Sequence, residues 1–537
     1  MKHNAPSRRD ALIHLAALGA AAPLALNLAA IGHASAQTAG PTSPYKALVC
    51  IFLQGGNDSN NMLLATDPGS FNQYWAARNL GTDPIALMPP GTTPVPVGQV
   101  SPVTKRAVTS ASQPEHWGGV LPIKPATAQL VPGANKVSSA SAVRTFAVHP
   151  MLSNVQSLFA SGRLAAIANV GTLLMPLTKT DYQKPGPTTL IPQRLFSHSD
   201  QQSAWQSGHV EGSATGWGGL IGDTFAASSP SALTFSAITT AGNTVFLAGS
   251  STRPFRVNFG KNRATAQTIS LLSASGVYNQ SSVLLSELRA GLQEASLGVG
   301  DSNFLVVDYA AAVARSISSS VVYDTALGAM GGAYTLVPAP SPFTDPISGK
   351  VIDNTLADQL QAVAETAAAH ALLGVRRQVF FVQYGSFDTH DGENPRQGLL
   401  LAQLDHALSY FDSVLAKLGM GDQVTAFTAS DFNRTFTTNG DGTDHAWGGH
   451  HFVMGGAVKG GDIYGTYPTL GIDRVATSST PAFANPDAVG NALIPTTSVD
   501  VYMATMGSWM GVTADQLKVI FPNLGRFAKP NLGFMRA

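Results

Sequence analysis

Residues 379–384 read Val-Phe-Phe-Val-Gln-Tyr, and residues 423–430 read Gln-Val-Thr-Ala-Phe-Thr-Ala-Ser. Both runs are short, mostly apolar and free of glycine and proline, which is typical of a strand buried in a sheet. A helical pattern precedes each run, over residues 354–374 and over an apolar stripe at residues 400–418. The alternation of helices with buried strands predicts an α/β fold, a mostly parallel sheet sandwiched by helices.

Two more apolar runs extend this pattern toward the amino terminus. They cover residues 46–53 and residues 164–170, and each predicts another buried strand. The first contains the single cysteine of the chain, Cys50. We expect Cys50 to be a buried core residue, and one cysteine excludes an internal disulfide.

Acidic residues follow three of the predicted strands. Asp58 comes after the first strand and a Gln-Gly-Gly-Asn turn, Asp388 after the strand at 379–384, and Asp431 directly after residue 430. In open α/β sheets, ligands bind beyond the carboxyl ends of the strands. We therefore expect these acids to meet at one edge of the sheet.

Histidines accompany these acids and predict a metal site. The candidate ligands are Asp58, Asp388, His390, Asp431, Asp444 and His445. Aspartate oxygen and histidine nitrogen are common ligands of divalent cations, and the set suits zinc, manganese or calcium. Asp388, His390 and His445 predict one ion, whereas Asp58 and Asp431 would hold a second. Asp444 is either a ligand or a support for an imidazole.

The segment Phe-Ser-His-Ser-Asp at residues 196–200 has the polar start of a helix. A hydroxyl group at a helix amino terminus, where backbone N–H groups face an anion, suits phosphoryl or sulfuryl transfer. Ser197 and Ser199 are therefore candidate nucleophiles, with His198 between them as a further catalytic candidate. Arg434 is a candidate for binding the anionic group.

The amino terminus predicts export. Two arginines at residues 8–9 precede an Ala/Leu-rich run to about residue 31, and Ala-Ser-Ala follows at residues 34–36. This pattern predicts a cleaved twin-arginine signal over residues 1–36, recognised by the twin-arginine export machinery, and a periplasmic or secreted protein. A transmembrane anchor is the alternative reading. No second stretch of spanning length stands out, so we expect no stable membrane span in the mature chain.

Charge and length limit the remaining possibilities. The chain has 32 Lys and Arg and 32 Asp and Glu, so it has no basic excess to bind nucleic acid. Residues 37–537 exceed the usual size of one hydrophobic core. We predict a single α/β domain with irregular insertions at about 83–143 and 208–351, which form a cap.

Six motifs resemble, in this order, those of the bacterial family called domain of unknown function 1501. They are FLQGGNDSNN (52–61), FSHSDQQSAWQSG (196–208), GSFDTHDGE (385–393), FTASDFNRTFTTNG (427–440), GTDHAWGGHHFVMGGAVKGGDIYG (442–465) and WMGVTADQLKVIFP (509–522). That family is grouped with the alkaline phosphatase and sulfatase superfamily. The resemblance implies a mostly parallel sheet that carries one or two metals and a nucleophile at a helix start.

The resemblance also implies roles for single residues. Asp58 resembles the first-strand metal ligand, and Asp431 resembles the acid of the second metal. Asp388, His390 and His445 resemble the ligands of the first metal. The chain departs from the superfamily at Phe432, where phosphatases have a histidine, and in the shorter spacing between Asp388 and His390.

The residues around Ser197 and Ser199 also lack the Pro and Arg that follow a formylglycine precursor, which argues against that type of sulfatase. Together these features predict an exported metal-dependent hydrolase of phosphate or sulfate esters, acting on a small-molecule or glycan anionic ester. The alternative is a non-catalytic cell-envelope binding protein, because the second set of ligands has no histidine. Similarity of fold does not choose between these functions.

Overall fold

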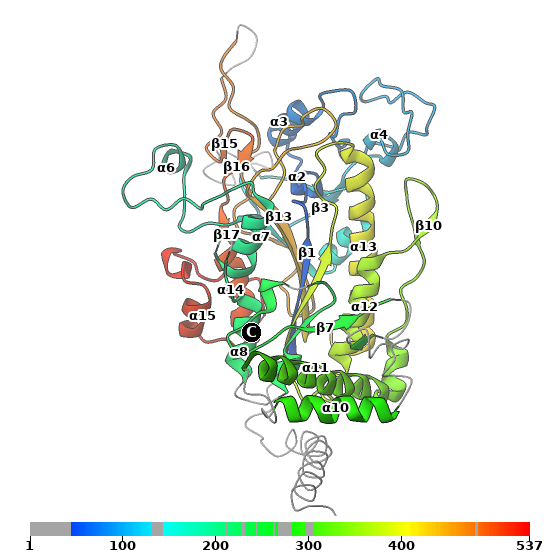
Figure 1. Ribbon diagram of the computed structural model, residues 1–537. Coiled ribbons are helices and arrows are strands. Elements are labelled where there is room, and N and C mark those ends of the chain that lie inside the picture. Colours follow the sequence, from blue (N-terminus) through cyan, green and yellow to red (C-terminus); the bar gives the residue numbers. More distant parts are fainter. Residues whose placement is uncertain are drawn as a thin grey trace, which may run out of the picture.

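The computed structural model describes residues 44–131, 143–209, 212–226, 231–242, 244–260, 264–266, 282–296, 304–477 and 482–536 (Figure 1). The predicted export signal at residues 1–36 lies outside the described residues.

A central sheet organises the molecule, and over the described residues it has ten strands. Their order is β14-β5-β13-β12-β1-β11-β6-β7-β8, and β17 also pairs with β5. The strands are β1 (Lys46–Leu53), β5 (Leu164–Gly171), β6 (Ala237–Thr239), β7 (Phe255–Asn258), β8 (Thr265–Ala266), β11 (Arg377–Tyr384), β12 (Val424–Ser430), β13 (Gly449–Met454), β14 (Ile463–Tyr464) and β17 (Thr497–Ser498). Six of the pairings are parallel and three are antiparallel, which confirms the predicted α/β fold with a mostly parallel sheet.

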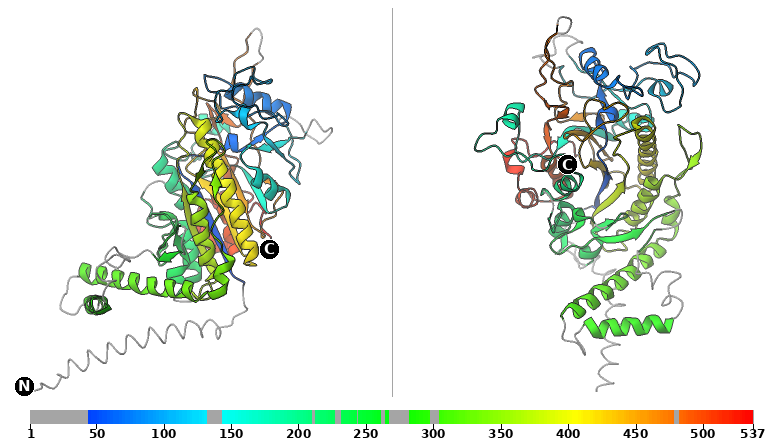
Figure 2. Two further views of the ribbon diagram at one scale, coloured as in Figure 1. Left: turned by 90° about the vertical axis from the view of Figure 1, so that its right-hand side faces the viewer. Right: turned by 45° about the horizontal axis from the view of Figure 1, so that its top comes forward.

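Helices cover both faces of this sheet (Figure 2). One face packs against α5 (Ser153–Ala160), α12 (Thr355–Ala368) and α13 (Glu393–Lys417). The other face packs against α7 (His198–Ser207), α8 (Trp217–Ala226), α14 (Val499–Met510) and α15 (Ala514–Ile520). The sandwich arrangement agrees with the prediction.

Strand β1 shows why the sheet needs both layers. Its residues are buried from Ala47 to Leu53, because side chains along a strand point alternately to the two faces. Val49 and Ile51 join the core under α12 and α13, whereas Cys50 joins the core on the other face. Cys50 is a free, buried thiol, as the sequence predicted.

The register of the three central strands sets the position of the loops that follow them. Leu53 in β1 is level with Tyr384 in β11 and with Ser430 in β12. All three strands run in parallel, so the turn after β1 and the loops after β11 and β12 emerge side by side.

Small elements complete the described fold. The minor strands are β2 (Leu63–Ala65), β3 (Leu121–Ile123), β4 (Phe146–Val148), β9 (Phe343–Thr344), β10 (Val351–Ile352), β15 (Ala488–Val489) and β16 (Ala492–Leu493). Further helices and 3₁₀ turns are α2 (Ser59–Met62), α3 (Pro68–Arg78), α4 (Pro114–Trp117), α6 (Lys179–Gln183), α9 (Ala232–Phe235), α10 (Ser282–Ser296), α11 (Phe304–Ala329), η2 (Val245–Leu247), η5 (Gly331–Leu336) and η6 (Leu524–Arg526).

The segment 208–351 differs from the expected cap. Its strands β6, β7 and β8 extend the central sheet beyond β11. These strands have two to four residues each, too few to produce a recognisable apolar pattern in the sequence. Helices α10 and α11 form a hairpin near the amino end of β1, whereas α2 follows its carboxyl end (Figure 1).

Helix α11 also differs from expectation in its composition. Residues 305–329 form a helix long and apolar enough to cross a membrane by length and composition alone, and its most apolar window of 18 residues has a mean hydropathy of 1.3. This apolar helix contradicts the prediction that no second stretch of membrane-spanning length follows the export signal. Serines at positions 316 and 318–320 interrupt the apolar run in the sequence, although the helix continues through them.

Candidate metal centre

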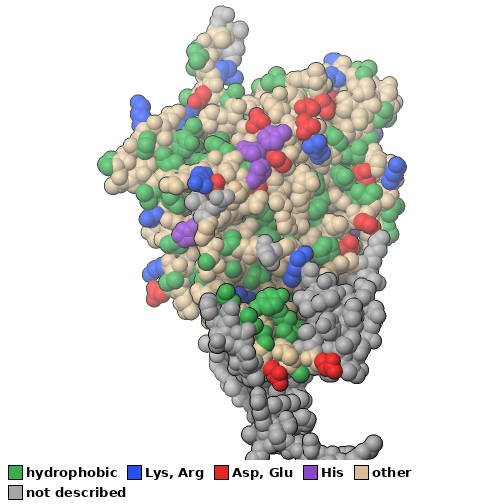
Figure 3. Space-filling model, viewed as in Figure 1, with side chains coloured by type: hydrophobic (Ala, Val, Ile, Leu, Met, Phe, Trp, Pro, Cys, Tyr) green, Lys and Arg blue, Asp and Glu red, His purple; other side chains and the backbone are tan. Residues whose placement is uncertain are grey.

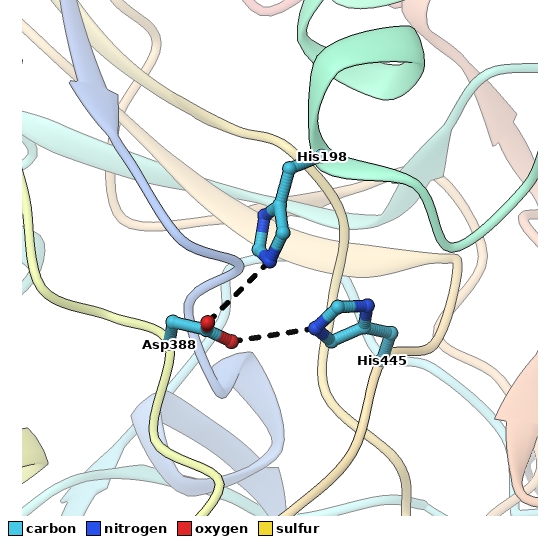
Figure 4. A group of neighbouring side chains, drawn as sticks. All are labelled: His198, Asp388 and His445. Carbon is cyan, nitrogen blue, oxygen red and sulfur yellow. Dashed lines mark hydrogen bonds and ion pairs between the residues drawn. The ribbon is translucent and has the colours of Figure 1, made fainter.

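His198 and His445 converge on Asp388 beyond the carboxyl ends of β11 and β12 (Figure 4), and His390 also lies next to this aspartate. His198 is the first residue of α7, Asp388 and His390 lie in the loop after β11, and His445 precedes β13. One ligand atom from each of His198, Asp388 and His445 lies within 4.8 Å of the other two.

The distances within the group are those between possible ligands of one ion. Asp388 Oδ1 lies 3.1 Å from His390 Nε2 and 3.3 Å from His445 Nε2. Asp388 Oδ2 lies 3.5 Å from His198 Nε2, and the Nε2 atoms of His390 and His445 are 2.9 Å apart. Ligands of a tetrahedral zinc ion, at bonds of about 2.0–2.1 Å, lie about 3.3 Å from one another.

The other nitrogen of each imidazole has an acceptor that fixes its proton. His198 Nδ1 lies 2.7 Å from Asp431 Oδ2, His390 Nδ1 lies 3.2 Å from Asp444 Oδ1, and His445 Nδ1 lies 2.7 Å from the carbonyl oxygen of Phe196. Carboxylate and carbonyl oxygens only accept hydrogen bonds, so each Nδ1 donates. In a neutral imidazole this leaves the lone pair on Nε2.

When all three imidazoles are neutral, their Nε2 lone pairs face the carboxylate of Asp388. Lone pairs and a carboxylate repel one another unless a cation or a proton lies between them. Two imidazole nitrogens and one carboxylate oxygen, those of His198, His445 and Asp388, lie within 4.8 Å of one another and are ligand types of a divalent site, and His390 Nε2 lies beside them at 3.1 Å from Asp388 Oδ1. Fixed Nδ1 protons are the usual support for metal-binding histidines. The residues thus fit a divalent cation.

Asp431 and Gln202 hold His198 in this orientation. Asp431 is fully buried and accepts hydrogen bonds from Gln202 Nε2 at 3.0 Å and from the backbone N–H of Gly55 at 3.3 Å. The hydrogen bond that His198 donates to Asp431 raises the pKa of His198 above its usual value, whereas burial lowers the pKa of His445. Asp431 thus lies behind an imidazole, and not among the atoms that face Asp388.

Arg434 brings a positive charge to the same carboxylate. Its side chain is fully buried, its Nη2 donates to Asp388 Oδ1, and its Nη1 lies 3.5 Å from His390 Nε2. Partial burial raises the pKa of Asp388, but the charges of Arg434 and His198 outweigh this effect and hold that pKa below its usual value. Arg434 Nη1 is therefore placed to donate to an anion beside the histidines.

The structure places Asp58 in a different environment. Asp58 and Arg78 form an ion pair in which both side chains are fully buried, and Arg78 Nη2 donates to Asp58 Oδ1 at 3.0 Å. Burial raises the pKa of Asp58, but Arg78 overcomes this effect and keeps it below its usual value. Asp58 also accepts from the backbone N–H of Asn60 at 3.2 Å, which caps α2. The carboxylate of Asp58 is thus paired with a cationic side chain of the protein, the guanidinium of Arg78.

The two candidate serines lie beside the histidine group without a contact to it. Ser197 Oγ donates to Asp200 Oδ2 at 2.7 Å, and Ser199 is exposed. Within the described ranges, no hydrogen bond joins either hydroxyl to Asp388, His390 or His445. The serine nucleophile stays a prediction that these contacts do not support.

The turn after β1 allows the loops to approach closely. Gly55 has a φ of +109°, and a Cβ atom there would lie 2.6 Å from the backbone nitrogen of Asp388. A Cβ atom on Gly56 would lie 2.4 Å from the ring of Phe432. That ring packs against His198 and His445 with centroid separations of 4.8 and 4.5 Å. Phe432 therefore fills the space between the two imidazoles and the glycine turn.

The site opens on the surface, where histidine and acidic side chains gather (Figure 3). Asp388 is 45 % exposed, and Asp444 and Asp391 on the same loops are 60 and 71 % exposed. The carboxylate of Asp388 is therefore accessible from solvent.

Sequence reasoning did not assign three of the groups that build this site. His198 was taken as a catalytic group beside a serine, and its role as a possible ligand was missed. Gln202 and the carbonyl of Phe196 were also missed. The spacing of four residues between His198 and Gln202 places both on one face of α7, which was the available signal.

Comparison with known proteins supports the predicted family. A family model described as "Protein of unknown function (DUF1501)" matches residues 344–521. The matched segment contains Asp388, His390, Asp431, Arg434 and His445, whereas Asp58 and His198 lie before it. No curated protein matches the chain.

Solved structures also align with the chain. One of them is described as "Crystal structure of Ps i-CgsB in complex with k-i-k-neocarrahexaose", and the alignment covers 71% of this chain and 72% of that chain at 9% identity. Its TM-score of 0.30 is too low to carry an argument about fold or function.

Proposed function

We propose that this protein is an exported, metal-dependent hydrolase of phosphate or sulfate esters. The observation that carries the proposal is the orientation of three imidazoles, each with its Nδ1 hydrogen fixed and its Nε2 directed at Asp388. The sequence resemblance to the alkaline phosphatase and sulfatase superfamily supports the same reaction class. The predicted signal at residues 1–36 supports a periplasmic or secreted location.

His198, Asp388, His390 and His445 would hold one divalent cation. When bound, such a cation supplies Lewis-acid stabilisation of the negative charge that develops on the ester during hydrolysis. Asp431 and Asp444 keep the protons of His198 and His390 on Nδ1, so that both Nε2 atoms stay available. The ring of Phe432 excludes water from one side of His198 and His445.

Arg434 would bind the anionic part of the ester. Its burial fixes the guanidinium in place, and Nη1 faces the histidine group. Because Nη2 donates to Asp388, Nη1 would donate to a phosphoryl or sulfuryl oxygen, and the permanent charge of the guanidinium would attract the anion. We assign the nucleophile to water, since the Ser197 hydroxyl is engaged with Asp200 and Ser199 faces solvent.

Metal analysis of the purified protein and its Asp388→Ala variant tests the proposal. We expect about one equivalent of a divalent metal in the wild type and its loss in Asp388→Ala, with loss of aryl phosphate or aryl sulfate hydrolysis. Asp391→Ala is the matched control, because Asp391 lies in the same loop but pairs with Arg396 at 3.1 Å. Less than about 0.2 equivalents of metal in the wild type would refute the metal site.

A second candidate function follows from the buried ion pair of Asp58. Asp58 was predicted to bind a second metal, but its carboxylate is already paired with Arg78. A non-catalytic cell-envelope protein that binds an anionic glycan through one metal and Arg434 has no need of that second ion. Stoichiometric metal without hydrolysis of either ester would favour this function.

A further inference from the structure

The hairpin of α10 and α11 projects from the α/β body, away from the metal centre (Figure 2). The most apolar window of α11 is only 17% buried. Core helices of soluble domains bury their apolar side chains, so an exposed helix of this composition indicates a contact surface.

The exposed residues of α11 lie on one face of its amino-terminal half. Six of the seven exposed residues between 305 and 316 recur at spacings of three and four residues, namely Leu305, Asp308, Tyr309, Ala312, Arg315 and Ser316. Tyr309 is 73% exposed, and Val306 beside this face is 40% exposed. The face therefore combines large apolar groups with small residues at its centre.

Two opposite charges flank that centre. Asp308 and Arg315 are seven residues apart, which places them on the same face, about 10.5 Å apart along the helix axis. In the part of the chain that the structure describes, neither side chain has an ion-pair partner. Burial of both in lipid would cost several kilocalories per mole, which argues against a membrane as the occupant of this face.

The face is complementary to itself. If two copies of α11 pack antiparallel about a twofold axis between Ala311 and Ala312, Asp308 lies opposite Arg315 of the partner subunit. The same operation places Arg315 opposite the partner's Asp308, so two ion pairs form for one contact. Alanines at the crossing point let the helices approach closely, and Tyr309 then covers the partner helix.

We propose that this protein forms a homodimer through the exposed face of α11. The occupant of the face is a second copy of the same helix, held by reciprocal ion pairs between Asp308 and Arg315 and by apolar contacts of Tyr309 and Val306. A contact between one pair of helices buries less surface than stable protein interfaces do, which bury about 1,200 Å² or more in total. The dimer therefore dissociates on dilution.

Sedimentation equilibrium of the mature protein over a range of concentrations measures the dimer directly. Asp308→Arg or Arg315→Asp alone places like charges opposite each other and raises the dimer dissociation constant about tenfold or more. The double variant D308R/R315D restores opposite charges and returns the constant to near its wild-type value. Glu287→Arg is the matched control, since it makes the same change of charge at an exposed position of α10.

Three outcomes would overturn the proposal. The first is a wild-type protein that stays monomeric at about 100 µM. The second is a double variant that dissociates as readily as the single variants. The third is a monomer that co-sediments with vesicles of phosphatidylcholine and phosphatidylglycerol, which would assign the face to a membrane. An unchanged urea unfolding midpoint in every variant, measured at a concentration where the protein is monomeric, shows that the fold is intact.

Discussion

At the scale of single residues, the candidate site depends on carboxylates that lie behind the histidines and do not face Asp388. Asp431 is fully buried, accepts from His198 Nδ1 at 2.7 Å and accepts from Gln202 at 3.0 Å. These contacts select the imidazole tautomer and prevent rotation of the ring. Asp431 is therefore a positioning residue, although its place in the sequence suggests a direct ligand.

Replacement of Asp431 by asparagine tests this role. An amide in place of the carboxylate weakens the acceptor for His198, and partners of this kind commonly account for 10–100-fold in metal affinity. We expect a zinc dissociation constant about tenfold or more above that of the wild type. Competition with a chromogenic chelator measures it.

Asp405→Asn is the matched control for that measurement. Asp405 is also buried, and it accepts hydrogen bonds from the backbone of Asn154 and Val155 far from the histidines. Its replacement affects stability but leaves zinc affinity unchanged. Equal affinity in Asp431→Asn and the wild type would show that His198 does not need this support.

At the scale of elements, the turn between β1 and α2 sets the distance between the loops of the site. Alanine at Gly55 would need an unfavourable φ of +109° and would place its Cβ atom 2.6 Å from the nitrogen of Asp388. We expect Gly55→Ala to lower the free energy of unfolding by about 1–3 kcal/mol. Because the clash displaces Asp388, metal content should fall in the same variant.

Gly69→Ala provides the contrast, because Gly69 lies inside α3 and its Cβ atom would meet only Asp67 Oδ1 at 3.6 Å. Alanine favours a helix interior over glycine by about 0.5–1 kcal/mol, so this variant should be as stable as the wild type or more stable. Urea unfolding of both variants separates strain at the site from a general effect of an added methyl group. Similar stability of the two would refute strain at Gly55.

The same elements show what the sequence could and could not predict. Strand β1 was predicted with its observed bounds, since a continuous apolar run that follows a lysine and ends at a glycine turn is typical of a buried strand. The acids after β11 and β12 were placed at the correct edge, because parallel strands bring their carboxyl ends together. The ion pair of Asp58 with Arg78 was not predictable, since it depends on how α3 packs against the turn after β1.

The orientation of side chains was the other missing information. A histidine at the start of α7 can act as a ligand, a base or a helix cap, and only the position of the helix against β12 distinguishes these roles. Strands β6 to β8 were missed for a different reason. They have two to four residues each, too few for a recognisable hydrophobic pattern, and they form by successive pairing outward from β11, with β6 on β11, β7 on β6 and β8 on β7.

At the scale of the whole molecule, three buried histidines predict loss of stability in acid. Burial lowers the pKa of His149, His450 and His451 to about 3. In the unfolded chain each titrates near 6.5, so below that pH protonation stabilises the unfolded state by about 1.4 kcal/mol per pH unit and histidine. Asp500 has the opposite effect, because burial raises its pKa to about 6 and its protonation in the folded state stabilises the fold.

Between pH 7.5 and 5.5 the histidines dominate. Together they should remove about 4 kcal/mol from the free energy of unfolding, against less than about 1 kcal/mol returned by Asp500. Urea unfolding at the two pH values measures the difference. His450→Asn keeps an acceptor for the backbone N–H of Asn169, which lies 3.1 Å from His450 Nδ1, and should reduce the loss by about a third. An unchanged dependence on pH in that variant would mean that His450 titrates normally in the folded protein, and that acid sensitivity arises elsewhere in the fold.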